Sequence, residues 1–120
     1  MAKQALVLFA HGARDPQWAR PFRQLVAELG ELLPGERIAL AFLELMQPTL
    51  GECASVLHGD GVRKLRIVPV FLGSGGHLKK DLPKQVADIR ERFADLEISV
   101  ESPIGEQPAV IAAIARAIAG

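Results

Sequence analysis

Apolar runs alternate along the chain with segments in which apolar residues return every three or four positions. The four runs, at residues 5–10, 37–45, 64–72 and 96–101, have the length and composition of β-strands. The first is apolar at every position, which is typical of a strand buried on both faces of a parallel sheet. Pro69 lies inside the third run and has no N–H for the sheet ladder, so we expect that strand to be irregular there.

The segments between these strands predict helices. The helices are expected to begin at Asp15-Pro16, at Pro48, near Leu78 and at Gln107, and to end at Pro34-Gly35, at Gly59-Asp60-Gly61, at Phe93 and at Ala119. Pro83 places the start of the regular part of the third helix near Leu82. Four strand–helix units in succession predict an α/β fold, in which helices flank a four-stranded parallel sheet. Right-handed crossovers then give a small doubly wound, flavodoxin-like sheet of order 2-1-3-4 in a single domain, residues 1–120.

The composition fits one ordinary domain. The chain has 120 residues, of which 49% are hydrophobic and 23% are charged, so it can build one core. Its 14 lysines and arginines equal its 14 aspartates and glutamates. This balance argues against a nucleic-acid partner, because proteins that bind nucleic acid usually carry a basic excess.

Cysteine usage and hydropathy indicate the compartment. Cys53 is the single cysteine, so an internal disulfide is impossible and a reducing compartment is expected. The apolar run at 5–10 is shorter than the core of a signal peptide. No apolar run approaches the roughly 20 residues that span a bilayer. We therefore expect a cytoplasmic protein without a membrane partner.

The last predicted helix is unusual because Arg116 is its one charged residue. A helix that is apolar nearly all round is usually buried, whereas a single domain of this size would leave its terminal helix half exposed. This helix therefore suggests a subunit interface. The alternative is that alanine, a strong helix former, simply covers an ordinary surface.

Two histidines follow predicted strands. His11 comes after the first strand and His77 after the third, and in the order 2-1-3-4 these strands are neighbours. Ligands of open α/β sheets bind beyond the carboxyl ends of the strands, so both histidines flank one crevice. Imidazole binds divalent transition metals and titrates near neutral pH. Glu44, at the end of the second strand, could complete the site or accept protons. Each residue could instead be an ordinary polar surface residue.

Glycines and cations surround the histidines. Gly73, Gly75 and Gly76 do not have the spacing of a phosphate-binding P-loop, and they indicate a loop that a ligand approaches closely before a helix begins. Three cations, Arg14, Lys79 and Lys80, lie beside the two histidine loops. A metal site ringed by positive charge suggests an anionic substrate, although exposed lysines are usually only solvated charges.

Two other reactive residues have structural interpretations. His58 is placed at the end of the second helix, where a cation suits the helix dipole. Cys53 is on the apolar face of the same helix and is expected to be a core thiol.

Three segments resemble a known family. The stretches "HGARDP", "FLELMQPTL" and "VPVFLGSGGHLKKDLP" are similar to the signatures of small, single-domain sirohydrochlorin cobaltochelatases of the CbiX type, in the class II chelatase family. Related sirohaem ferrochelatases and nickel chelatases share the pattern. The resemblance covers about residues 6–96 and continues less distinctively through "ESPIGEQPAV".

The resemblance implies a chelatase-like fold and insertion of a divalent metal into sirohydrochlorin without ATP. It implies that His11 and His77 bind the metal and assist deprotonation of the pyrroles, and Glu44 matches a family glutamate that could be a ligand or a base. It also implies that this chain is half of a two-domain chelatase and that a homodimer rebuilds the full cleft. Arg14, Lys79, Lys80 and the helix N-termini can meet the carboxylates of the macrocycle, and Gly75 and Gly76 permit its close approach.

The metal and two other functions stay open. Cobalt is the first candidate, and Fe²⁺ or Ni²⁺ remain possible, so the pathway is cobalamin or sirohaem synthesis. A histidine phosphatase would also carry a histidine followed by glycine, but it has arginine directly before that histidine, where this chain has Ala10. A non-catalytic metal or tetrapyrrole carrier would use the same ligands as a chelatase.

Overall fold

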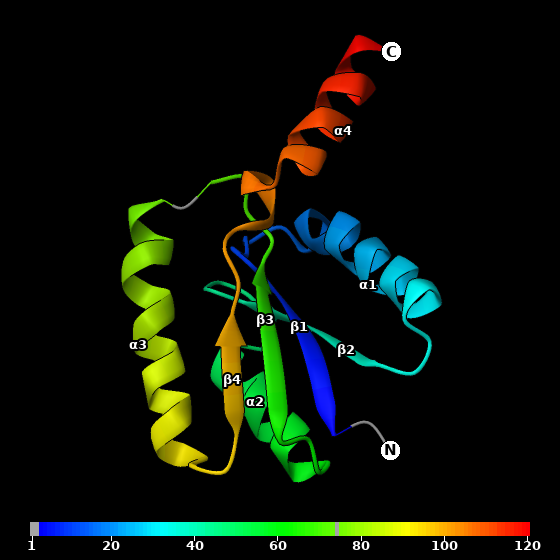
Figure 1. The fold of residues 1–120 in the computed structure, drawn as a ribbon. Helices are drawn as coiled ribbons and strands as arrows, with labels where there is room; N and C mark the ends of the chain where they lie inside the picture. Colours follow the sequence, from blue (N-terminus) through cyan, green and yellow to red (C-terminus); the bar gives the residue numbers. More distant parts are fainter. Residues whose placement is uncertain (1–2, 74) are drawn as a thin grey trace.

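The computed structural model describes residues 3–73 and 75–120, and it confirms the α/β fold. Its elements are β1 (Gln4–Ala10), η1 (Pro16–Ala19), α1 (Arg20–Leu32), β2 (Arg37–Phe42), α2 (Leu50–Gly59), β3 (Lys64–Pro69), α3 (Gly76–Arg92), β4 (Glu97–Val100), η2 (Ile104–Glu106) and α4 (Pro108–Ala119). All neighbouring strands are parallel, in the predicted order β2-β1-β3-β4 (Figure 1). The carboxyl ends of β1 and β3 therefore lie side by side.

The two faces of the sheet are packed differently. We call the face that α2 and α3 cover the covered face. Its large cluster includes Val7 and Phe9 from β1 together with Ile67 from β3, all fully buried. We call the other face, against which α1 packs, the open face. It takes the alternate residues Leu6, Leu8 and Val68, because successive side chains of a strand point to opposite sides.

Three strands are shorter than the hydrophobic pattern predicts, and the fourth lacks the predicted residue at each end, because it runs from Glu97 to Val100. The second strand ends at Phe42 rather than at residue 45, because the backbone turns through Leu45 with φ of 66° and returns, so that Phe42 N donates to Pro48 O. The third strand ends at Pro69 rather than at residue 72. Val70 N donates to Phe9 O, so the nitrogen of Pro69 faces the β4 side. Glu101 N donates to Ile67 O there, and the next hydrogen bond of the ladder would need an N–H at Pro69, so the pairing of β3 with β4 ends at this point.

The helix starts also differ from the prediction. The first helix is divided into η1 and α1, and Pro21 stands in the first turn of α1. The second begins at Leu50 rather than Pro48, because Thr49 and Glu52 form a capping box that satisfies the first N–H groups. The third begins earlier than predicted, at Gly76, and Pro83 lies inside it.

The C-terminal helix α4 extends away from the sheet (Figure 1). It packs mainly against η2. Gly105 fixes η2 to the loop after β3: its N–H donates to Phe71 O, and a Cβ at this position would lie 2.3 Å from Leu72 Cα. Among the described residues, no helix is long and apolar enough to cross a membrane.

Candidate active site

His11 stands directly after β1, at the carboxyl edge of the sheet, and is exposed. Its ring is supported by the edge of the Phe71 ring, with centroids 6.3 Å apart, and its Nδ1 lies 2.8 Å from Gly12 O. Glu44 N donates to His11 O, so the backbone joins the loops after β1 and β2. His11 and Glu44 therefore belong to one edge of the sheet, as predicted.

Gly12 makes this close contact possible. Its φ is +95°, and a Cβ there would lie 1.9 Å from the carbonyl oxygen of Glu44. No other residue type could hold this conformation at this distance without moving the Glu44 loop. The glycine that follows the histidine in "HGARDP" is thus explained by the approach of two loops.

His77 is the second residue of α3, at the same edge of the sheet. Its side chain is 79% exposed, and Nδ1 lies 3.6 Å from the Asp81 carboxylate, one helical turn further on. This contact is too long for a hydrogen bond, so it is an ion pair only when the ring is protonated. No contact joins the His77 ring to His11 or Glu44 in the described part of the chain, where no group of three His, Cys, Asp or Glu side chains could hold a metal.

The predicted cations lie in different places. Arg14 is exposed beside Asp15, which caps η1. Lys80 borders a shallow depression with His77 and Lys84. Lys79 instead lines a pocket of about 490 Å³ between α3 and β4. The two lysines therefore do not act at one point, because neighbouring residues of a helix point about 100° apart.

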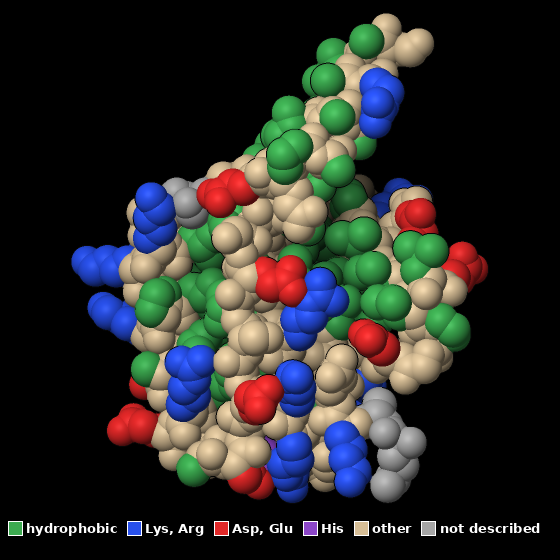
Figure 2. Space-filling view, viewed as in Figure 1, with side chains coloured by type: hydrophobic (Ala, Val, Ile, Leu, Met, Phe, Trp, Pro, Cys, Tyr) green, Lys and Arg blue, Asp and Glu red, His purple; other side chains and the backbone are tan. Residues whose placement is uncertain are grey.

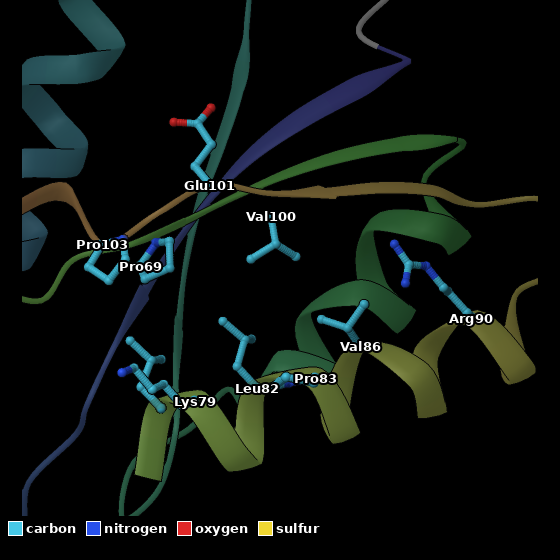
Figure 3. Close-up of a pocket in the computed structure, with 10 residues that line it drawn as sticks. Pro69, Lys79, Leu82, Pro83, Val86, Arg90, Val100, Glu101 and Pro103 are labelled. Carbon is cyan, nitrogen blue, oxygen red and sulfur yellow. The ribbon is translucent and has the colours of Figure 1, made fainter. Parts of the chain in front are cut away.

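The pocket between α3 and β4 is apolar in the middle and charged at its rim (Figure 3). Leu82 and Val86 on α3 face Val100 on β4. Arg90 borders the pocket at the far end of α3 and donates to Ile98 O. His11 and His77 do not line this pocket, so we do not place the candidate active site in it.

The predicted glycines form the entrance to α3. Gly75 is the N-cap of the helix and Gly76 its first residue, and neither has a side-chain cap. A Cβ added at either glycine would have no other atom within 4 Å. The first N–H groups of α3 therefore face outward next to His77, where they can attract an anion. Ser74 of the same loop lies outside the described residues.

His58 and Cys53 fit the structural interpretations. His58 is in the last turn of α2, beside the start of β3 and away from the carboxyl edge, and its Nε2 lies 2.8 Å from Asp95 Oδ1. This hydrogen bond is the main cause that lowers the pKa of Asp95. Cys53 is buried, and burial raises the pKa of its thiol to about 11, so it is a poor nucleophile.

Sequence reasoning missed three neighbours of the histidines. Asp81 and Lys84 share a helix face with His77, and the spacing of four and seven residues in "HLKKDLPK" is the signal that could have found them. Phe71 supports His11 from the loop after β3. That contact has no local signal, because it joins residues 60 positions apart and depends on the pairing of β1 with β3.

Comparison with solved structures defines the class as chelatase-like. The CbiX protein of Marinobacter aquaeolei VT8 has a TM-score of 0.86 at 31% identity, over 97% of this chain and 94% of that one. The sirohydrochlorin chelatase SirB of Bacillus subtilis subspecies spizizenii, solved in complex with cobalt, has a TM-score of 0.80 at 26% identity, over 99% of this chain and 50% of that one.

Sequence comparison assigns the family. The CbiX family model matches residues 5–120, and the chain belongs to the CbiX family. A sirohydrochlorin cobaltochelatase of Methanopyrus kandleri is 38% identical over 85 residues, which are 68% of this chain and 57% of that protein. The matched part of this chain thus spans little more than half of that relative.

Proposed function

We propose that this chain inserts a divalent metal, with Co²⁺ as the first candidate, into sirohydrochlorin without ATP. The observation that carries this proposal is the placement of His11 and His77 at one sheet edge in a chain of the CbiX family. The name of the Methanopyrus relative supports both the macrocycle and cobalt, and the SirB structure in complex with cobalt supports the metal. Fe²⁺ and Ni²⁺ are the other candidate substrates.

The reaction replaces two N–H bonds of the macrocycle by bonds to the metal and releases two protons. In this proposal His11 and His77 hold the incoming ion through imidazole nitrogen and take up the pyrrole protons as the ion leaves them. Both rings are exposed at the carboxyl edge, where a broad flat substrate can reach them. Glu44 would relay a proton or act as a further ligand, and the hydrogen bond from its N–H to His11 O, which joins the two loops, supports this role.

Recognition of the substrate rests on its carboxylates. Arg14 and Lys80, on either histidine loop, would pair with carboxylates at the rim of the ring, and Lys79 would meet one on the β4 side of α3. Gly75 and Gly76, which carry no side chains, would let the macrocycle approach the first turn of α3.

The remaining features of the proposal concern assembly and location. Residues 1–120 form one chelatase-like domain that corresponds to half of a two-domain chelatase, and SirB, matched over 50% of its length, supports this. A homodimer would bring two such halves around one macrocycle. We place the protein in the cytoplasm, in cobalamin or sirohaem synthesis according to the metal.

Metal insertion into sirohydrochlorin, followed by visible absorbance with Co²⁺, Fe²⁺ and Ni²⁺, tests the proposal. We expect catalysis of many turnovers per chain with the native protein and a loss of at least tenfold in rate in both His11→Ala and His77→Ala. His58→Ala is the matched control, because His58 lies away from the carboxyl edge, and it should keep the native rate. A native rate no faster than the spontaneous reaction would overturn the proposal.

The same assays separate the alternatives. A carrier would bind cobalt or sirohydrochlorin but release no more than one metallated ring per site. A histidine phosphatase would hydrolyse p-nitrophenyl phosphate and lose that activity in His11→Ala. Loss of insertion in His11→Ala, with no hydrolysis by the native protein, would exclude both.

A further inference from the structure

Two histidine–aspartate pairs lie in the described part of the chain, and they differ in whether an ion could enter between the partners. His58 Nε2 lies 2.8 Å from Asp95 Oδ1, and Arg63 Nε lies 3.1 Å from the other carboxylate oxygen. This first pair is closed by a hydrogen bond and a cation. His77 Nδ1 lies 3.6 Å from Asp81 Oδ2, and the His77 side chain is 79% exposed. The second pair is therefore open to solvent and to a ligand.

The separation of His77 from Asp81 fits two ligands of one metal ion. Zn²⁺ and similar divalent ions hold imidazole nitrogen and carboxylate oxygen at about 2.1 Å, so two such ligands at a tetrahedral angle are about 3.4 Å apart. The observed 3.6 Å is close to that value and is too long for a direct hydrogen bond. A spacing of four residues puts both side chains on one face of α3, so no loop has to move to bring them together.

The surroundings of the pair leave room for the rest of a coordination shell. The pair lies in the shallow depression of about 510 Å³ that Gly76, Lys80 and Lys84 also line. The Asp81 side chain is 39% exposed, so both possible ligands face water. An ion held by the pair would keep water in its other positions, and a substrate nitrogen could replace that water.

The charges around the pair explain why a carboxylate is needed there. The depression lies at the N-terminus of α3, where the helix dipole is positive, and it is lined by two lysines. Figure 2 shows Lys and Arg side chains over this part of α3, at the left of the view. Asp81 is the single acidic residue among the described residues that line the depression. An imidazole alone would hold a divalent cation poorly in this setting, and the Asp81 carboxylate offsets the positive charge.

We propose that His77 Nδ1 and Asp81 Oδ2 form a capture site that binds the divalent metal ion before the macrocycle receives it. Asp81 is then a metal ligand in addition to the residues of the candidate active site, and His11 and Glu44 take no part in the capture. Two protein ligands flanked by two lysines hold an ion weakly, which suits an ion that must be released. The inference rests on the proposed function for the fate of the ion, whereas the capture itself needs no macrocycle.

Titration of Co²⁺ into the native protein without sirohydrochlorin, followed by NMR of the backbone amides, tests the capture site. The largest paramagnetic shifts are expected at residues 76–81. Asp81→Asn should weaken Co²⁺ binding at least about tenfold, because even the loss of a group that only orients a ligand costs this much. Asp88→Asn is the matched control: it removes the same charge from an exposed position of α3 outside the depression, and it should bind Co²⁺ as the native protein does. Native affinity in Asp81→Asn, or the largest shifts elsewhere, would overturn the proposal.

A replacement ligand distinguishes coordination by Asp81 from a merely orienting role. In Asp81→His the new imidazole stands one turn from His77 and is itself a good ligand for divalent transition metals. This variant should recover most of the Co²⁺ binding that Asp81→Asn loses, and circular dichroism shows whether both are folded. If Asp81 only orients the His77 ring by its charge, Asp81→His will bind as weakly as Asp81→Asn, and the ligand role is wrong.

The insertion assay keeps this inference separate from the proposed function. Asp81→Asn should raise the Co²⁺ concentration at half-maximal rate more than it lowers the maximal rate, because a high concentration of ion makes capture unnecessary. Insertion by a native protein whose Co²⁺ binding does not depend on Asp81 would remove the capture site and leave the proposed function standing. Binding that depends on Asp81 without any insertion would remove the function alone.

Discussion

The covered face and the open face are built from alternate residues of the same strands, yet they differ in how completely they are closed. On the covered face, Leu57 and Ile89, from α2 and α3, are 2% and 1% exposed above a continuous cluster of buried residues. On the open face, Leu25 and Leu29 of α1 are only partly buried. The two faces therefore differ in the number of helices that lie on them, two on the covered face and one on the open face.

The two faces differ because the helices are distributed unequally over the sheet. α2 and α3 follow β2 and β3 and return over one face, whereas α1 covers the β2 side of the other. α4 also carries exposed apolar residues, but it extends beyond the sheet. Two helices thus close the covered face, whereas α1 alone lies on the open face.

The largest expected effect compares one leucine from each face. Leu57→Ala on the covered face should lower the free energy of unfolding by about 2–5 kcal/mol, because it leaves a cavity in a closed core. Leu29→Ala on the open face should cost about 1 kcal/mol, because the side chain already has a part of its surface in water. Urea denaturation of both variants and of the native protein, at equal protein concentration, is the measurement. Equal losses would show that the two faces are equally closed.

The next effect concerns the anchor at the rim of the open face. Gly105→Ala places a Cβ within 2.3–2.6 Å of the Leu72 backbone, so η2 must shift, at a cost of about 1–3 kcal/mol. Gly35→Ala, where a Cβ would meet nothing within 4 Å, is the control and should change stability little. Thermal unfolding of both variants is the measurement. If Gly105→Ala is as stable as the control, η2 is not the fixed point of α4.

A smaller loss of stability is expected when the ion pair on the open face is removed. Arg66 on β3 and Glu101, directly after β4, form a hydrogen-bonded ion pair that is partly exposed. This hydrogen bond raises the pKa of Arg66. Glu101→Gln should cost less than about 1 kcal/mol, and the loss should shrink in high salt, because solvent and ions screen exposed pairs. A salt-independent loss above that size would mean that a partner buries the pair.

The smallest effect on stability is expected for Asp95, which lies at the edge of the sheet opposite His11 and His77. The hydrogen bond from His58 is the main cause that lowers the pKa of Asp95, so the ionised carboxylate favours the folded state. This stabilisation is present above the ordinary pKa of aspartate and is lost as the pH falls through the lowered pKa. Asp95→Asn should therefore melt slightly below the native protein at pH 7 and together with it in strong acid. The account would be contradicted if the difference in melting temperature between Asp95→Asn and the native protein stayed the same from pH 7 to strong acid.

Most of the fold could be predicted because periodicity is a local signal. The alternation of apolar runs with helical spacing predicted the order of strands and helices and the parallel sheet, and these are confirmed. The ends of the strands and helices were less predictable. Leu43 and Glu44 are apolar and polar as a strand requires, and Leu43 N still donates to Ala10 O at the end of β1, but Glu44 N donates to His11 O in the following loop and the backbone turns at Leu45.

The candidate site was predictable to the level of its sheet edge and no further. His11 and His77 follow neighbouring strands, so topology alone brings them to one edge. The pairing of His77 with Asp81 and the separation of Lys79 from Lys80 depend on the phase of α3, which begins earlier than Pro83 suggested. Their catalytic roles stay predictions until the insertion assay is done.

Local spacing and the handedness of crossovers were enough to predict the α/β class, the strand order and the edge at which the histidines stand. The tertiary structure supplied the contacts that no local pattern contains. It placed Gly12 against Glu44 and Phe71 against His11, and it sent α4 away from the sheet. These are contacts between segments far apart in the chain, and their geometry depends on how the finished sheet brings the segments together.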